Sequence, residues 1–441
     1  MRSSRLLPLL LAASAFACSG DSEPNRSDGG TSDGPKAGDG PNNTGKTLTW
    51  IAPETLDENR AGKYAAIASC GDKIGVAYFR SLKDQPVVQC PATALGPGAK
   101  KPRPAQDLYY IEFDGSAWGT PVNIDQTIGP AFGLSLAMAP GSCAPHVGYL
   151  GGELSQQECS SSDAVIASSS DSGQTWTKQT VSGSGGTGDT VGHWMSVAVD
   201  GSGAVHSAYR DVHYGFYEQD GNKKASLWYD TTKVSGDNGS GVYAMLVFDQ
   251  SDNPVIMHYN GTEMGTFGGL QIASNKGASW ELDQVLAGST SERPSLATDG
   301  SGTFGIAYYK PSKQALHFME SSDLKTWDET QVDTNLTRNG EFSSLAFDSQ
   351  GNPAIAYYLC NDYNETSCDF TKDGLNYAHR VGTKWKVYEK IDTGDVQRCG
   401  EYTALTFDSA DEPVIAYKCV AYDNLSGEWV DTLKVIRGVY K

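Results

Sequence analysis

Basic residues are scarce in this sequence. Its 34 lysines and arginines stand against 53 aspartates and glutamates, which gives a formal net charge of -19. Contact with a nucleic-acid backbone needs clustered lysine and arginine, and electrostatic docking on an anionic membrane surface needs the same. We therefore expect no nucleic-acid partner and no charge-driven membrane attachment.

Long apolar stretches are lacking after the N-terminus, so the sequence predicts no transmembrane span. It also contains no Cys-x-x-Cys pair, no phosphate-binding glycine loop and no clustered set of metal ligands, and its 7 histidines are scattered. We therefore expect neither a cofactor nor a metal ion.

A sequence motif that ends in an alanine- and tyrosine-rich segment recurs seven times along the chain. The clearest copies are SLATDGSGTFGIAYY (295–309), SLAFDSQGNPAIAYY (344–358) and ALTFDSADEPVIAYK (404–418). The equivalent positions, 49 to 71 residues apart, are Tyr78, Tyr149, Tyr209, His258, Tyr308, Tyr357 and Tyr417. Repeats of this length with only strand and turn signals are typical of a β-propeller, because one small sheet buries both faces only when neighbours stack on it. The sequence predicts an all-β fold, a seven-bladed β-propeller of four-stranded antiparallel blades.

Each repeat predicts four strands. We expect strand one at 345–347, a turn at 348–351 and strand two at 353–358, with strands three and four exemplified by 316–320 and 326–332. The fourth strand carries a tryptophan in most repeats, namely Trp118, Trp176, Trp280, Trp327 and Trp385. The third repeat lacks it after Tyr229, which predicts a shortened outer edge.

The last repeat has too few residues for a fourth strand. After Tyr417 there is room for a third strand at 432–439 only, while segment 49–57 resembles the fourth strand at 326–333. We therefore expect residues 49–56 to pair with residues 432–439, so that the N-terminal strand completes the last blade and no edge stays open.

The N-terminus has the features of an export signal. Arg2 and Arg5 precede an apolar core, and small residues follow, up to Ala17. Cys18 and a Gly-, Ser-, Asp- and Pro-rich run come next, which resembles a bacterial lipoprotein. We expect a signal peptide at 1–17, a lipidated Cys18 with a flexible linker at 18–46 and the propeller at 47–441. The protein would then be an outer-membrane lipoprotein, held to the bilayer by its N-terminal lipid only; the alternative is cleavage after Ala17 and secretion.

The other eight cysteines form an even set, which predicts disulfides in an exported chain. Cys70 and Cys143 occupy the same turn of successive repeats, and Cys90 and Cys159 the same long loop on the opposite face, so we expect the pairs Cys70–Cys143 and Cys90–Cys159. Cys399 and Cys419 are symmetric about the turn 409–411 and can face each other across a hairpin. Cys360 and Cys368 remain as a pair, with an exchange among these last four left open.

The segment Ser169–Trp176 reads SSDSGQTW and matches the pattern S-x-D-x-G-x-T-W at every defined position. Segments 273–280 and 321–327 are degenerate copies. The chain thus resembles the Asp-box, or BNR-repeat, propellers, a group that includes sialidases. The resemblance implies that the box is a structural hairpin away from the ligand face, with Asp171 capping its turn and Trp176 packing between blades.

In propellers, the residues that enter strand one and leave strand two line one rim of the channel. The candidates for ligand binding there are Lys63, Arg80, His193, Trp194, Arg210, Arg293, Lys310 and Lys418. Such a mixture of charged and aromatic side chains suits polar ligands, above all sugars. The alternative is a solvated rim with internally paired charges.

A glycosidase needs two carboxylates, and the candidates are Glu292, Glu341, Glu401 and Asp211. The sialidase resemblance would add Arg80, Arg210 and Arg293 as a clamp for a substrate carboxylate. The Arg-Ile-Pro signature of that family is absent, however, and seven repeats depart from its six blades. We expect a monomeric, non-catalytic binding or assembly module for a cell-envelope glycan or protein, with a sialidase-type glycoside hydrolase as the alternative.

Overall fold

The computed structural model describes residues 46–81, 106–128, 133–151, 163–183, 190–212, 225–236, 239–263, 266–277, 279–288, 293–333, 338–360, 368, 373–394, 398–423 and 427–441. All regular secondary structure in these ranges is β-strand. None of these residues belongs to a helix long and apolar enough to cross a membrane.

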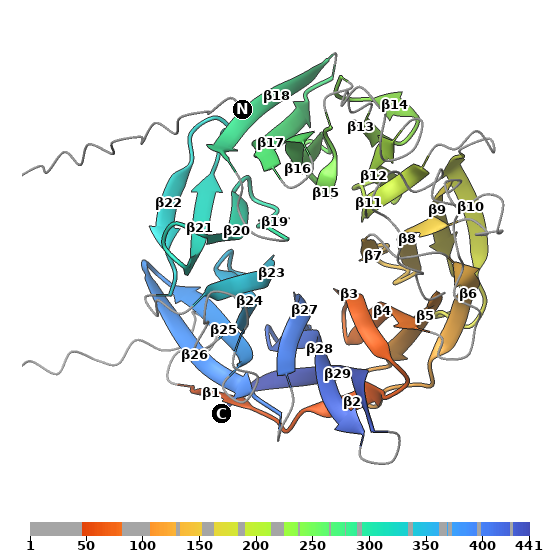
Figure 1. Cartoon of the computed structure of the whole chain (residues 1–441), viewed down its shortest axis with the longest axis vertical. Coiled ribbons are helices and arrows are strands. Elements are labelled where there is room, and N and C mark those ends of the chain that lie inside the picture. Colours follow the sequence, from red (N-terminus) through yellow and green to blue (C-terminus); the bar gives the residue numbers. More distant parts are fainter. Residues whose placement is uncertain are drawn as a thin grey trace, which may run out of the picture. The chain divides into compact units, whose positions relative to one another are not determined.

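The strands form seven antiparallel sheets, arranged as blades around a common axis (Figure 1). Blade one consists of β3 (Ala61–Cys70), β4 (Lys73–Ser81), β5 (Gln106–Phe113) and β6 (Val122–Ile128). Blade two consists of β7 (Leu134–Met138), β8 (Pro145–Gly151), β9 (Asp163–Ser168) and β10 (Thr177–Ser182). Blade three consists of β11 (Thr190–Val199), β12 (Val205–Val212), β13 (Ala225–Tyr229) and β14 (Thr232–Lys233). Blade four consists of β15 (Val242–Phe248), β16 (Pro254–Glu263), β17 (Thr266–Asn275) and β18 (Trp280–Ala287). Blade five consists of β19 (Ser295–Thr298), β20 (Phe304–Lys310), β21 (Ala315–Ser321) and β22 (Asp328–Gln331). Blade six consists of β23 (Asn339–Phe347), β24 (Pro353–Leu359), β25 (Gly374–Val381) and β26 (Lys384–Asp392).

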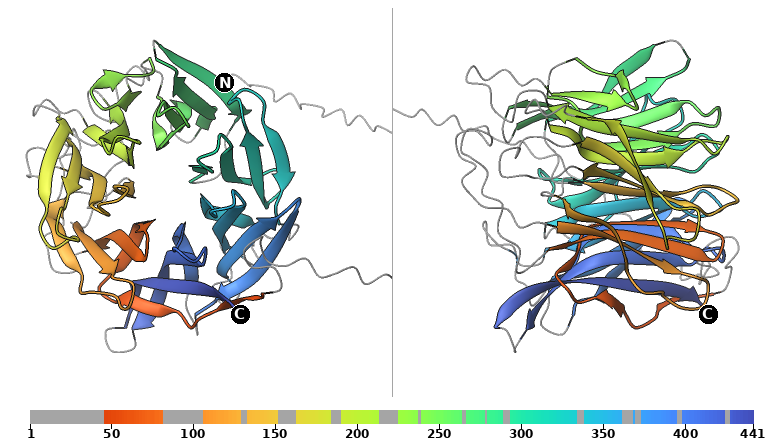
Figure 2. Two further views of the ribbon diagram at one scale, coloured as in Figure 1. Left: turned by 180° about the vertical axis from the view of Figure 1, so that it is seen from behind. Right: turned by 90° about the vertical axis from the view of Figure 1, so that its right-hand side faces the viewer.

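Blade seven joins strands from both ends of the described chain, as the sequence predicted. It contains β27 (Arg398–Phe407), β28 (Pro413–Asp423) and β29 (Glu428–Tyr440), with β1 (Leu48–Trp50) and β2 (Glu54–Asp57) both paired to β29. The registers are Leu48 opposite Tyr440 and Glu54 opposite Val435. The seven-bladed, four-stranded architecture is therefore confirmed, and Figure 2 shows the ring from behind and edge-on.

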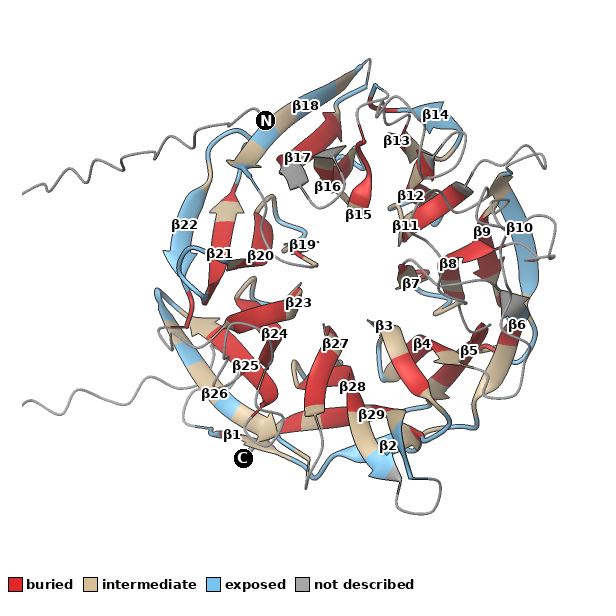
Figure 3. Cartoon of the chain, viewed as in Figure 1, coloured by how far each residue is buried: buried red, intermediate tan, exposed pale blue. Residues whose placement is uncertain are grey.

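The core lies between the blades, because each sheet packs both faces on its neighbours. The inner and middle strands are largely buried, while outer strands such as β10 and β22 are exposed (Figure 3). Two outer tryptophans pack on an aromatic ring of the preceding blade: Trp176 lies 5.1 Å from Tyr110, and Trp385 lies 5.3 Å from Phe318, between ring centroids. In blade three, which lacks this tryptophan, the outer strand β14 has two residues, as expected.

The Asp-box forms the structural hairpin that the resemblance implied. Asp171 Oδ1 accepts hydrogen bonds from the backbone N–H groups of Gln174 (3.1 Å) and Thr175 (2.8 Å), and Trp176 Nε1 donates to the Gly173 carbonyl (2.9 Å). Hydrogen bonds from Thr175 and Ser169 hold the pKa of Asp171 at about 2. The carboxylate is therefore fully used in turn formation.

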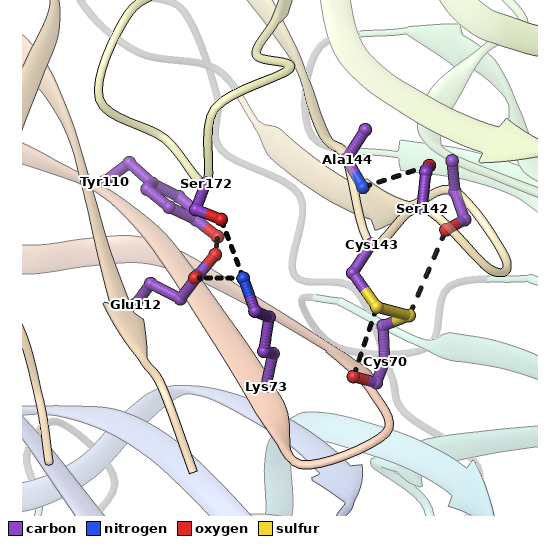
Figure 4. The surroundings of a disulfide bond; sticks show 9 residues. Cys70, Lys73, Tyr110, Glu112, Ser142, Cys143, Ala144 and Ser172 are labelled. Carbon is purple, nitrogen blue, oxygen red and sulfur yellow. Dashed lines mark hydrogen bonds and ion pairs between the residues drawn. A yellow bond between two sulfur atoms is a disulfide. The ribbon is translucent and has the colours of Figure 1, made fainter. Parts of the chain in front are cut away.

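Disulfides join three of the predicted cysteine pairs. Cys70–Cys143 links the hairpin turn of blade one to that of blade two (Figure 4), and Cys399–Cys419 bridges paired strands of blade seven. Cys360–Cys368 closes a short loop after β24. Cys18, Cys90 and Cys159 lie outside the described residues.

Beside the first disulfide, blades one and two are also joined by polar contacts. Lys73 Nζ donates to Glu112 Oε1 (3.2 Å) and to Ser172 Oγ (2.6 Å), and Ser172 belongs to the Asp-box turn of blade two (Figure 4). The Asp-box thus helps to position its neighbour as well as its own hairpin.

Candidate functional site

Seven residues with a left-handed backbone, one in each blade, stand at the inner end of the first strands. They are Tyr64 (φ 57°), Gly133 (φ 93°), Trp194 (φ 55°), Tyr243 (φ 54°), Arg293 (φ 64°), Phe342 (φ 52°) and Tyr402 (φ 53°). The pairing of the first and second strands shifts register around these positions in five blades. Such bulges redirect side chains, and a positive φ is uncommon for bulky residues. The same left-handed conformation thus recurs around the whole ring.

The five aromatic residues of this set form a chain of ring contacts, which we call the aromatic collar (Tyr64, Trp194, Tyr243, Phe342 and Tyr402). Ring centroids are 4.3 Å apart for Tyr243 and Trp194, 6.3 Å for Trp194 and Tyr64, 5.0 Å for Tyr64 and Tyr402, and 4.8 Å for Tyr402 and Phe342. These residues come from blades four, three, one, seven and six. The collar therefore brings together positions that are far apart in the sequence.

Arg293 of blade five lies over the collar. Its guanidinium carbon is 4.5 Å from the ring centroid of Tyr64 and 4.9 Å from that of Tyr402, which are cation–π distances. Since these tyrosines belong to blades one and seven, the arginine reaches across the axis.

Next to the collar lies a cavity of about 250 Å³ on the axis. All seven blades line it, with Ala65, Ala66, Ile67, Gly133, Leu134, Ser135, Leu136, Trp194, Met195, Tyr243, Ala244, Met245, Arg293, Pro294, Ser295, Phe342, Ser343, Ser344, Leu345, Thr403, Ala404 and Leu405. The lining mixes small apolar side chains with hydroxyl groups. The guanidinium of Arg293 adds one charged group to this lining, so the cavity suits a polar ligand group.

Several residues expected on an exposed rim are in fact buried. The exposed fraction is 1% for His193, 4% for Asp211, 6% for Lys418 and 8% for both Glu341 and Glu401. They lie at the ends of strands that neighbouring blades cover, so the sequence pattern overstated their contact with solvent.

Two of the described rim carboxylates, Glu341 and Glu401, contact basic side chains. Glu401 lies 2.7 Å from Lys418 and 2.9 Å from Arg398, and Glu341 lies 2.7 Å from Arg338. The partner of Glu341 comes from its own blade, three residues earlier in the chain. Glu292 lies outside the described residues.

The basic residues of blades one and five are also held by acids. Arg80 forms an ion pair with Asp57, and Lys310 Nζ lies 2.7 Å from Glu329 Oε1. Burial alone would raise the pKa of Asp57, but hydrogen bonds from Tyr78 and Arg80 outweigh it and lower that pKa. Asp57 thus stays ionised at neutral pH, as a partner for Arg80.

Of the predicted site residues, Trp194 and Arg293 line the axial cavity, while Lys63 and Lys418 lie over the collar rings of Tyr64 and Tyr402 at 5.6 and 5.3 Å. Sequence reasoning missed the rest of the collar, although a signal was present. Glycine, any residue and an aromatic residue recur at 62–64, 192–194, 241–243, 340–342 and 400–402.

Two groups of potential metal ligands occur among the described residues, and each contains a disulfide, Cys360–Cys368 or Cys399–Cys419. A disulfide sulfur is not the thiolate that binds metal. Neither group is therefore a candidate metal site.

No protein-family model and no curated protein matches this sequence. Among solved structures, the chain is similar to a protein of unknown function from Dyadobacter fermentans DSM 18053, with 11% identity and a TM-score of 0.48 over 88% of this chain and 98% of that one. It is also similar to the Trypanosoma rangeli sialidase in complex with sialic acid, with 12% identity and a TM-score of 0.45 over 88% of this chain and 58% of that sialidase. The NanB sialidase from Streptococcus pneumoniae has 12% identity and a TM-score of 0.44 over 88% of this chain and 70% of its own. The chain thus spans little more than half of the T. rangeli enzyme, and likenesses this weak carry no argument about activity.

Proposed function

We propose that this protein is a non-catalytic binding module whose ligand, a glycan or a protein of the cell envelope, docks at the aromatic collar. The collar is the observation that carries the proposal. Aromatic faces bind the apolar faces of sugar rings, as well as apolar and cationic side chains of proteins. A cavity with hydroxyl groups in its lining lies beside it, so a ligand on the collar would meet both apolar surface and hydrogen-bonding groups.

The charge arrangement favours binding over hydrolysis. A glycosidase needs an acid and a second carboxylate facing each other across an open pocket. Glu341 and Glu401 instead contact Arg338, Arg398 and Lys418. Both carboxylates are thus engaged by basic side chains.

A glycan-array screen with the full chain tests this proposal. We expect binding that Trp194→Leu weakens by about tenfold, because the substitution removes a stacking face while keeping an apolar side chain. Trp429→Leu is the matched control, since Trp429 is 55% exposed and outside the collar. Equal binding by both variants would contradict a role for the collar.

The competing hydrolase function has its own test. Turnover of aryl-glycoside or sialoside substrates, lost on Glu341→Gln or Glu401→Gln, would overturn the non-catalytic proposal. We expect no turnover by the wild-type protein.

We also propose that the protein is exported and tethered by a lipid on Cys18. The disulfides support export, because such bonds persist in oxidising compartments. The lipid would hold the propeller near the membrane through the segment 18–46, where an envelope ligand is within reach.

A further inference from the structure

The junction between blades three and four departs from the repeat. The position that is tyrosine in the other six copies is His258 in blade four. On the facing strand of blade three, Arg210 is the next residue after the repeat tyrosine Tyr209. Arg210 and His258 thus place polar groups in the same interface.

Arg210 and His258 meet at Gly241 of blade four. A Cβ added to Gly241 would lie 2.9 Å from the Arg210 Cβ, so the arginine side chain passes directly over this glycine. The Gly241 N–H lies 3.4 Å from His258 Nδ1. Asn260 is two residues beyond His258 in β16 and so lies on the same face of that strand. Arg210 and His258 thus meet from two blades, and Asn260 lies on the same face of β16 as His258.

One atom of each side chain is buried without a hydrogen-bond partner among the described residues. These atoms are Arg210 Nε, His258 Nε2 and Asn260 Oδ1. Burial lowers the pKa of Arg210 to about 10 and that of His258 to about 4, so at neutral pH the arginine is charged and the histidine is neutral. Buried polar groups are normally hydrogen-bonded, and buried charges are normally paired, so this cluster needs an explanation.

Other blades differ from this junction in the pairing of their basic side chains. Basic side chains near the end of the second strand have an acidic partner elsewhere, Asp57 for Arg80, Glu329 for Lys310 and Glu401 for Lys418. Arg210 has no acidic partner in the described part of the chain.

We propose that Arg210, His258 and Asn260 form a binding site for an oxyanion, a carboxylate or phosphate group carried by a small ligand or a partner. A guanidinium offers parallel N–H donors that fit two oxygens of such a group. His258 Nδ1 lies 3.4 Å from the Gly241 nitrogen and 3.2 Å from the Tyr259 carbonyl oxygen. In the tautomer whose Nδ1 accepts from Gly241, Nε2 carries the proton and becomes a second donor. The amide of Asn260 supplies a third donor from its nitrogen, since the two ends of an amide are exchanged by rotation. This site stands on the blade interface and does not depend on the function proposed for the collar.

Thermal unfolding of the full chain in sodium chloride, phosphate and acetate at equal ionic strength tests the site. We expect phosphate or acetate to raise the wild-type melting temperature by about 1–3 °C over chloride. A response to acetate alone identifies a carboxylate site, and a response to phosphate alone identifies a phosphate site. Arg210→Met should abolish the response without lowering the melting temperature in chloride, because an apolar side chain replaces a half-buried guanidinium whose Nε has no partner among the described residues.

Arg60→Met is the matched control, since Arg60 forms an exposed ion pair with Glu428, and it should keep the response to the anion. Asn260→Ala should weaken the response and serves as a second variant if Arg210→Met fails to fold. An equal response in wild type and Arg210→Met, or none in wild type, would overturn the proposal. In crystals soaked with bromide, an anomalous peak beside Arg210 Nε would support the site, and a water molecule there would overturn it.

Discussion

Tyr357 donates a 2.7 Å hydrogen bond to Asp333 Oδ2, and both side chains are buried at the junction of blades five and six. The same bond, from a second-strand tyrosine to an aspartate of the preceding blade, recurs in Tyr78–Asp57, Tyr149–Asp125 (2.7 Å) and Tyr417–Asp392 (2.6 Å). It provides a charge-assisted hydrogen bond inside an otherwise apolar interface. The repeated tyrosine is therefore an inter-blade contact as well as core packing.

Tyr357→Phe should lower the free energy of unfolding by about 1–3 kcal/mol, because Asp333 loses a donor in a buried environment. Denaturant unfolding measures the change. Tyr422→Phe is the control, since Tyr422 is 46% exposed, and it should have almost no effect. Equal losses in the two variants would mean that the inter-blade bond contributes nothing.

The stability of the protein should fall as the pH drops from about 6.5 to about 4. The pKa of His258 is lowered to about 4 by burial, so the unfolded chain takes up its proton first and gains relative stability. One such group contributes on the order of 2–3 kcal/mol over this range. His258→Gln should flatten the slope there in pH-dependent unfolding experiments.

Below about pH 4 the wild type and the His258→Gln variant should both lose further stability. The pKa of Asp57 is lowered by its hydrogen bonds, so the stability that this carboxylate contributes is lost as the pH falls through its folded-state value. A His258→Gln variant with the wild-type slope above pH 4 would contradict the assignment to His258.

Deleting residues 1–57 should abolish the cooperative unfolding transition, whereas deleting residues 1–46 should leave it nearly unchanged. Only the longer deletion removes β1 and β2, with the buried Leu48 and with Asp57, the partner of Tyr78 and Arg80. Calorimetry of the two truncated chains measures the difference. Matching transitions would show that blade seven is stable without its N-terminal strands.

Cys18→Ser should move the protein from the membrane fraction to the soluble fraction and abolish labelling by a fatty-acid analogue. The proposed attachment to the membrane is a lipid on this cysteine, so removing the thiol should release the protein. A wild-type protein that is already soluble, with an unmodified Cys18 at its mature N-terminus, would refute lipidation.

The ring and its closure were predictable because the repeat marks the second strands so clearly. Strand β24 (Pro353–Leu359) extends the predicted segment by one residue. The first strand of the same blade was underestimated, since β23 begins at Asn339 and not at 345. Gly340 and Phe342 have positive φ angles within it, and a left-handed aromatic residue inside a strand contradicts ordinary strand propensity.

The site was harder to predict than the fold. The collar depends on ring contacts between blades, such as Tyr64 with Tyr402, and no local pattern states which rings meet across the axis. The ion pairs were easier in part: Glu401–Lys418 follows from strand pairing within blade seven, whereas Glu341 contacts Arg338 through a local bend that no strand pattern indicates. Burial of Arg210 without an acid is visible only once blades three and four are packed together.

The closure of blade seven also fixes the order in which the molecule can be completed. Thr49 bonds to the Val439 carbonyl across 390 residues, so the first strands to be synthesised are among the last to find a partner. Until β29 emerges, β1 and β2 are loose strands and the growing ring keeps an open edge. Unpaired edges invite pairing with other chains. A premature stop codon before β29 would leave the strands of blades one to six unchanged. The protein would still be prone to aggregate, because β1, β2 and the edge of blade seven would have no partner.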